Sequence, residues 1–171
     1  TTKLFRVPPI MMFSLARSGK TTALLSLLNR LLHPELPFAP IFISFNGDSN
    51  FKRRKGESDV DAFLRNVAGA LLPSSPPHGM VCSEVELEKY LSTSRLPIVL
   101  LVDELNALNS PGSPELSELM RTMFLDRPGR YLCCTSHWAV SLNETAMGVT
   151  EADSPRDQKI VSVAHTRDLD T

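Results

Sequence analysis

Gly19, Lys20 and Thr21 are the first neighbouring residues of this chain whose types and order could do chemistry together. They follow the apolar segment 10–13, and a leucine-rich segment with helical spacing comes after them. Backbone N–H groups at a helix start attract an anion, a lysine there can reach outer phosphates, and a threonine hydroxyl can bind Mg²⁺. The pattern predicts a phosphate-binding loop of a nucleotide site. Its predicted contacts are Ser14, Arg17, Ser18, Gly19, Lys20, Thr21 and Thr22.

A second candidate feature is a pair of carboxylates after a continuous apolar run. Residues 98–102 form this run, and Asp103 and Glu104 follow it directly. Such a run is typical of a strand buried on both faces, and ligands of parallel sheets bind at the carboxyl ends of the strands. We therefore expect Asp103 to hold Mg²⁺ together with Thr21, and Glu104 to polarise an attacking water. The alternative is that the two acids only end the strand and cap the next helix.

Polar residues also end the neighbouring apolar segment 131–136. Thr135, Ser136 or His137 could sense a terminal phosphate there, although a strand that simply ends in polar residues is an equal alternative. An arginine could stabilise charge on the transferred group, and a solvated surface role is the alternative for each candidate. These arginines are Arg127, Arg130, Arg156 and Arg167. The predicted catalytic set is Lys20, Glu104, Ser136 and Arg156.

Strand-like and helix-like segments alternate along the chain and would position these side chains. Strands are predicted over 10–15, 41–45, 98–102, 131–136 and 160–164, and helices over 20–32, 59–72, 83–93 and 113–125. Alternation of this kind implies parallel strands joined by right-handed crossovers. The expected fold is therefore a three-layer α/β domain, with an open, mostly parallel sheet and helices on both faces.

Bulk composition limits the classes of function. The 171 residues are 42% hydrophobic with a formal net charge of −1, which suits one domain over 1–171 and gives no global footprint for nucleic acid. No apolar stretch approaches the roughly 20 residues of a membrane span, no signal peptide is recognisable, and the three cysteines match no zinc pattern. We expect reduced cysteines, an intracellular location, and a chain that is a piece of a longer protein.

One local basic run lies at 51–55, where Phe51 precedes four cations. Such a run could bind nucleic acid through its phosphates, and a solvated charged face is the commoner explanation. Glu57, Asp59 and Asp61 follow and offset much of its positive field.

Taken together, the segments 18–22, 43–47, 100–106 and 135–137 resemble the ATPase domain of Crinkler-type effectors and retrotransposon-hot-spot proteins, within the AAA+/STAND-like P-loop NTPases. The resemblance extends over residues 10–137 and, more loosely, over 156–170, and its most specific part is Asp-Glu-Leu-Asn at 103–106. It implies ATP and Mg²⁺ as cofactors, Lys20 and Thr21 as the Walker A contacts, and Asp103 and Glu104 as the Walker B pair. It also implies a sensor at Ser136 or His137 and an association with the host nucleus.

The sequence thus predicts Mg²⁺-dependent ATP binding and slow hydrolysis as a conformational switch, with a partner domain or subunit supplying an arginine. One alternative is a nucleotide-binding regulatory module without turnover, which Ser14 favours because glycine is usual there, and which Glu104 opposes. Another is a P-loop kinase, for which residues 141–158 make a poor arginine-rich lid. GTP is less favoured than ATP because no Asn-Lys-x-Asp guanine motif is present.

Overall fold

The computed structural model describes residues 8–13, 19–46, 53–71, 82–108, 114–136 and 159–162. The strands are β1 (Ile10–Phe13), β2 (Ala39–Ser44), β3 (Ile98–Asp103), β4 (Arg130–Ser136) and β5 (Lys159–Ser162). The helices are α1 (Lys20–Leu31), α2 (Asp59–Leu71), α3 (Glu84–Ser92) and α4 (Pro114–Met120), with a 3₁₀ turn η1 (Leu105–Ala107) and a π-helical turn η2 (Arg121–Leu125).

All strand pairs of the described sheet are parallel, in the order β2-β3-β4-β1-β5. Strand β4 therefore lies between β1, which leads toward the predicted phosphate loop, and β3, which carries the predicted carboxylates. Because parallel strands end at the same edge of a sheet, the carboxyl ends of β1, β3 and β4 lie together.

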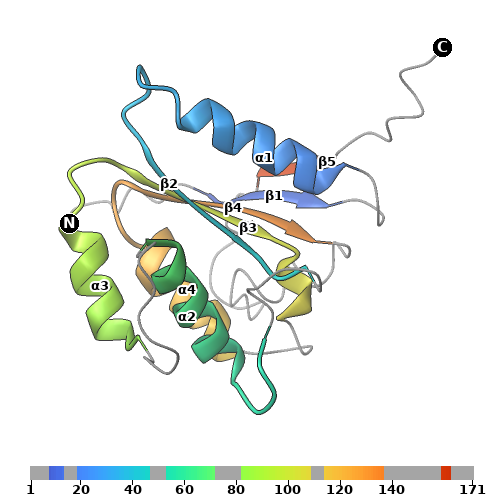
Figure 1. Ribbon diagram of the computed structural model, residues 1–171, viewed down its shortest axis with the longest axis vertical. Coiled ribbons are helices and arrows are strands. Elements are labelled where there is room, and N and C mark those ends of the chain that lie inside the picture. Colours follow the sequence, from blue (N-terminus) through green and yellow to red (C-terminus); the bar gives the residue numbers. More distant parts are fainter. Residues whose placement is uncertain are drawn as a thin grey trace.

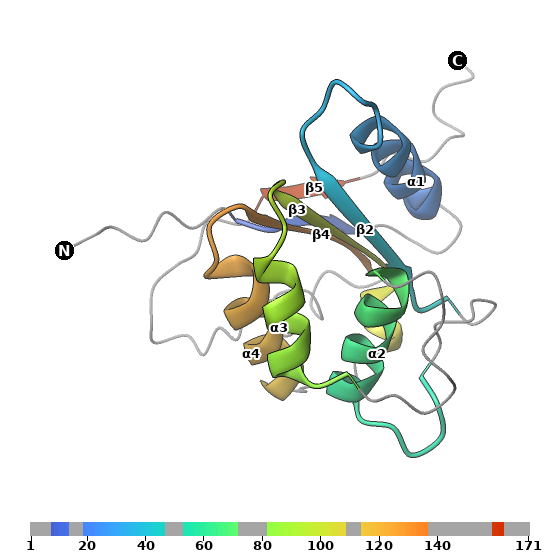
Figure 2. The ribbon, with the colours of Figure 1, turned by 60° about the vertical axis from the view of Figure 1, so that its left-hand side comes forward.

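Helices cover both faces of the sheet. Helix α1 lies over one face, and α2, α3 and α4 lie over the other (Figure 1), an arrangement that the turned view also shows (Figure 2). The larger hydrophobic core fills the side of α2–α4, and a smaller core packs under α1. The predicted three-layer α/β architecture is confirmed.

The predicted elements are found with small shifts at their ends. Strand β2 begins two residues earlier than expected and includes Pro40, which an edge strand tolerates because its N–H side need not pair. Helix α3 begins with a capping box: the Glu86 amide donates to Ser83 Oγ at 3.3 Å, and the Ser83 amide donates to Glu86 Oε2 at 2.9 Å. The helix predicted over 113–125 is α4 followed by η2, so its second half is wider than an α-helix.

Strand periodicity decides which side chains face α1. Cys133 packs in the core under α1 and Cys134 in the larger core, on opposite faces of the sheet. Burial raises the pKa of the Cys133 thiol to about 12. The three cysteines are free thiols. None of the helices in the described ranges is long and apolar enough to cross a membrane.

Candidate functional site

The candidate site begins with three polar side chains that form a row across adjacent strands. Ser44 pairs with Asp103 in the register of β2 and β3, and Thr135 occupies the next position after the last paired residue of β4. Side chains alternate along a strand. Because Leu101 and Cys133 pack under α1, residues two positions later, Asp103 and Thr135, lie on that same face.

Asp103 is the centre of this row and is fully buried. Its carboxylate accepts hydrogen bonds from three hydroxyls, each on a different element: Thr21 Oγ1 at 3.1 and 3.0 Å, Thr135 Oγ1 at 2.7 Å and Ser44 Oγ at 3.2 Å. A buried carboxylate needs such donors because leaving it unpaired is costly. The network joins α1, β2, β3 and β4 at one point.

The start of α1 brings the predicted lysine to this point. Gly19 precedes the helix with a φ of 84°, in the left-handed region that favours glycine, and a Cβ there would meet nothing within 4 Å. The requirement for glycine is therefore conformational, not steric. Lys20 follows and is 5% exposed. Burial lowers the pKa of its ammonium, an effect that the charges of Glu104 and Asp103 oppose.

Glu104 leaves the strand in an unusual backbone conformation. Its φ of 53° and ψ of 48° make it the one residue other than glycine with a positive φ in the described ranges. Its amide donates to Thr135 Oγ1 at 2.9 Å. A continued strand would send Glu104 to the face opposite Asp103. The left-handed turn breaks this alternation, and both carboxylates act on Lys20.

The donor set fits Mg²⁺ held together with a nucleotide. Thr21 Oγ1 and the Asp103 carboxylate are hard oxygen ligands about one hydrogen bond apart. Protein Mg²⁺ sites commonly use one or two carboxylates, several waters and substrate phosphates instead of an all-protein cage. In the described part of the chain, no group of three or more His, Cys, Asp or Glu side chains could hold a metal alone.

The predicted site residues are thus only partly brought together by the described structure. Gly19, Lys20, Thr21, Asp103 and Glu104 converge, and Ser136 is fully buried at the end of β4. Thr22 is exposed in the first turn of α1. The remaining predicted residues lie outside the described ranges: Ser14, Arg17, Ser18, His137, Arg156 and Arg167.

Two of the candidate arginines, Arg127 and Arg130, lie at the wrong edge of the sheet for this site. Arg130 begins the seven-residue strand β4 and Ser136 ends it, so the two residues are about 20 Å apart along the strand. Its guanidinium binds the Glu88 carboxylate through two hydrogen bonds of 2.6 and 3.0 Å and donates to the carbonyl of Met123 at 2.6 Å. A role for these arginines in the phosphate site of the same domain is therefore excluded by the β4 geometry.

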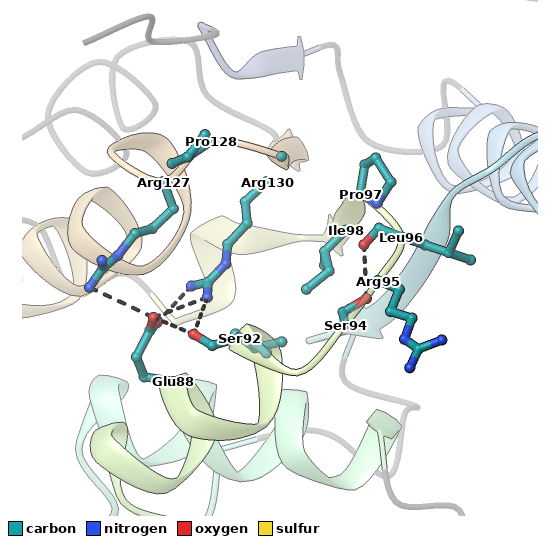
Figure 3. A pocket seen from close by; sticks show the side chains of 12 residues that line it. Glu88, Ser92, Ser94, Arg95, Leu96, Pro97, Ile98, Arg127, Pro128 and Arg130 are labelled. Carbon is teal, nitrogen blue, oxygen red and sulfur yellow. Dashed lines mark hydrogen bonds and ion pairs between the residues drawn. The ribbon is translucent and has the colours of Figure 1, made fainter. Parts of the chain in front are cut away.

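A cavity of about 390 Å³ opens beside these arginines. Figure 3 shows Arg127, Arg130 and Ser92 directed at the Glu88 carboxylate. The charges of these groups neutralise one another, so the cluster is an ion-pair network that links α3 to the start of β4. Hydrogen bonds from Arg130 are the main cause of a lowered pKa at Glu88.

We expect Glu88→Gln to lower the free energy of unfolding by about 1–3 kcal/mol, because it removes a half-buried partner of a buried guanidinium. Urea denaturation monitored by circular dichroism measures this. The matched control is Glu118→Gln. The Glu118 carboxylate, which pairs with Arg121, is exposed, so this substitution should change the free energy of unfolding by less than about 0.5 kcal/mol.

The ion pair between Glu88 and Arg130 also predicts how the stability of the domain depends on pH. Because the folded pKa of Glu88 is lower than its ordinary value of 4.5, its stabilisation is complete above that pH and is lost as the pH falls below it. Wild type should therefore lose its stability advantage over Glu88→Gln between about pH 5 and pH 3. An advantage that stays constant over this range would contradict the role of the Glu88 charge.

Two residues of the network were not assigned their roles by the sequence analysis. Ser44 was not singled out, although its place at the end of an apolar strand, as for Asp103, was the available signal. Thr135 is predicted only as one of three polar residues near the terminal phosphate, and not as a partner of Asp103. Both bind the Asp103 carboxylate directly.

No protein-family model and no curated protein matches this sequence. Several solved structures are similar to it in fold. Cdc6p from Pyrobaculum aerophilum has a TM-score of 0.57 at 19% identity, over 92% of this chain and 39% of its own. The Orc1 protein of Aeropyrum pernix, solved in complex with DNA, has a TM-score of 0.57 at 17% identity, over 96% and 42%. A Walker-type ATPase of Pyrococcus abyssi has a TM-score of 0.53 at 15% identity, over 91% and 49%.

This chain spans less than half the length of each of these proteins. At such identities the likeness concerns the fold alone. The narrower resemblance to Crinkler-type effectors stays a prediction. In the parallel sheet, β4 lies between the strands that lead to Lys20 and Asp103. The chain therefore has the α/β fold of the P-loop NTPases.

Proposed function

We propose that this domain binds ATP with Mg²⁺ and hydrolyses it slowly, as a conformational switch within a longer protein. The observation that carries the proposal is the hydrogen bonding of Thr21 to Asp103, which are 82 residues apart in the sequence, beside the buried Lys20 and the turn at Glu104. These residue types at one edge of a parallel sheet are those that phosphoryl transfer requires.

Each residue has a distinct role in this proposal. Lys20 binds the outer phosphates as a cation, and Thr21 and Asp103 supply oxygen ligands for Mg²⁺. A Mg²⁺ ion held by these two residues would supply positive charge that offsets the charge developing on the phosphates. Glu104 accepts a hydrogen bond, and finally a proton, from the attacking water.

Slow turnover is proposed because Arg127 and Arg130 lie at the opposite edge of the sheet. An arginine that stabilises the transferred phosphoryl group contributes about 10³-fold or more in rate. A partner domain or subunit would supply it, or Arg156, which lies outside the described residues. The comparison structures are longer than this chain, which is consistent with further domains.

Nucleic-acid binding through the basic run is a weaker candidate. The structure of the similar Orc1 protein contains DNA. Here, however, Arg53 forms an ion pair with Asp59 at 2.5 Å, and the nearby Arg65 binds Glu57 at 2.6 Å. These pairs reduce the positive field that a phosphate backbone would meet.

The proposal is tested by titrating the domain with ATP and GTP, each with and without Mg²⁺, and by measuring phosphate release under the same conditions. Saturable ATP binding that Mg²⁺ strengthens, with measurable phosphate release, supports it. No ATP binding at millimolar concentration would contradict nucleotide binding. Binding without release would support the regulatory module without turnover.

Thr21→Val should remove the effect of Mg²⁺ on ATP affinity. Valine keeps the branched shape but lacks the hydroxyl that meets the Asp103 carboxylate. We expect Mg²⁺ to strengthen ATP binding by about tenfold in wild type, worth about 1.4 kcal/mol, and by less than about twofold in the variant. Calorimetric titration measures this. Thr93→Val, at the end of α3, is the matched control and should behave as wild type.

A further inference from the structure

A single hydroxyl links the two carboxylate residues of the site. Thr135 is fully buried, and its Oγ1 lies 2.7 Å from Asp103 Oδ1 and 2.9 Å from the Glu104 amide nitrogen. An amide can only donate, so the hydroxyl accepts there, and its one proton is then available for the carboxylate. The Thr135 hydroxyl therefore donates to the side chain of Asp103 and accepts from the backbone of Glu104, the next residue.

The backbone of Glu104 needs such support. A left-handed conformation is unfavourable for a residue with a Cβ and persists where the surroundings over-determine it. Three described features hold this turn. The Thr135 hydroxyl fixes the Glu104 amide, the Ala107 amide donates to the Glu104 carbonyl at 2.9 Å, and Leu105 is buried just beyond.

The turn also decides where the Glu104 side chain goes. Successive side chains of a strand point to opposite faces, so an extended Glu104 would face away from Asp103. In the structure, Glu104 and Asp103 both act electrostatically on the Lys20 ammonium. The left-handed conformation breaks this alternation, so Glu104 does not continue the extended path of β3.

We propose that Thr135 is a positioning residue for hydrolysis, because its hydroxyl locks the Glu104 turn and orients Asp103. Thr135 acts through these two residues and is not assigned any contact with the nucleotide. This inference rests on the proposed function, since it names the residue that sets the geometry of the same site. It differs from the predicted sensor role of Ser136 or His137, which would require contact with the terminal phosphate.

The test compares Thr135→Val with Thr135→Ser. Valine preserves the shape and removes both hydrogen bonds, whereas serine preserves the hydroxyl. We expect Thr135→Val to lower kcat for phosphate release by about 10- to 100-fold, as small displacements of catalytic groups do. ATP affinity should change by less than about threefold, and Thr135→Ser should restore most of kcat. Thr122→Val, which also loses a hydroxyl bonded within the fold, is the matched control and should keep the wild-type rate.

A double-mutant cycle separates positioning from general destabilisation. Because Thr135 acts partly through Glu104, adding Thr135→Val to Glu104→Gln should lower kcat by a clearly smaller factor than Thr135→Val does in wild type, and only its effect through Asp103 should remain. Losses that multiply fully in the double variant would overturn the inference. Equal kcat in wild type and Thr135→Val would overturn it as well.

A readout independent of activity keeps this inference separate from the proposed function. Hydrogen exchange of the Glu104 amide, followed by NMR, should be at least about tenfold faster in Thr135→Val than in wild type and close to wild type in Thr135→Ser. If the wild-type domain released no phosphate but the variants showed these exchange rates, the proposed hydrolysis would be wrong. The inference that Thr135 holds the Glu104 turn would still be supported. An unchanged exchange rate of the Glu104 amide in Thr135→Val would contradict the proposed role of Thr135, whatever the rate of phosphate release.

Discussion

Lys20→Ala is expected to weaken ATP binding by about 100-fold, the largest effect on affinity that the structure predicts. Lys20 is buried at the start of α1, and the two acids of the site lie near its ammonium. An ammonium held in this way is a fixed cation for the outer phosphates. Without it, the bound phosphates would meet the charges of Asp103 and Glu104 with no cation from α1 to offset them.

Calorimetric titration with ATP measures this loss, and circular dichroism shows whether the variant folds. Lys89→Ala is the matched control, because Lys89 is an exposed lysine on α3, away from the site, and its removal should leave ATP affinity within about twofold of wild type. An unchanged affinity in a folded Lys20→Ala variant would show that the phosphates bind elsewhere.

Glu104→Gln should have the largest effect on turnover. Glutamine keeps the size of the side chain but cannot take a proton from water, and a positioned general base contributes about 10²- to 10⁴-fold in rate. We therefore expect kcat for phosphate release to fall by at least about 100-fold, with ATP affinity within about threefold of wild type. Single-turnover phosphate release and equilibrium titration measure the two quantities separately.

Glu84→Gln provides the control, because Glu84 is an exposed carboxylate in the first turn of α3. It should release phosphate at the wild-type rate. Identical rates in wild type and Glu104→Gln would eliminate hydrolysis by this site. They would leave the regulatory nucleotide-binding module as the better account, in agreement with Ser14 in the loop.

The two site motifs could be predicted from sequence because each lies within a short segment with a clear period. The apolar run 98–102 has the composition of a fully buried strand, and β3 is buried at every position from Ile98 to Asp103. The leucine pattern after Lys20 has the helical period of α1, which begins at the predicted residue. Local hydrophobic patterning therefore located both motifs and the edge of the sheet where they meet.

The arginine candidates show where the sequence was insufficient. Arg130 follows Gly129 at the start of an apolar strand, and nothing local tells whether its long side chain reaches a phosphate or a protein carboxylate. Its partner Glu88 is 42 residues earlier in the chain, on α3. Only the packing of α3 beside β4 makes this pair, so the pattern of residues around Arg130 could not reveal it.

What the sequence by itself determined is the fold class and the main pair of motifs, since both follow from the period of apolar residues and from glycine at the start of α1. Only the tertiary structure decided that Ser44 and Thr135 bind Asp103 and that Glu104 adopts a left-handed conformation at the end of β3. The physical reason is that these contacts depend on strand order and register. The contacts bring hydroxyls from β2 and β4 to a carboxylate on β3, although the three strands are distant in the sequence. The local conformational preferences of residues do not determine which distant strands become neighbours.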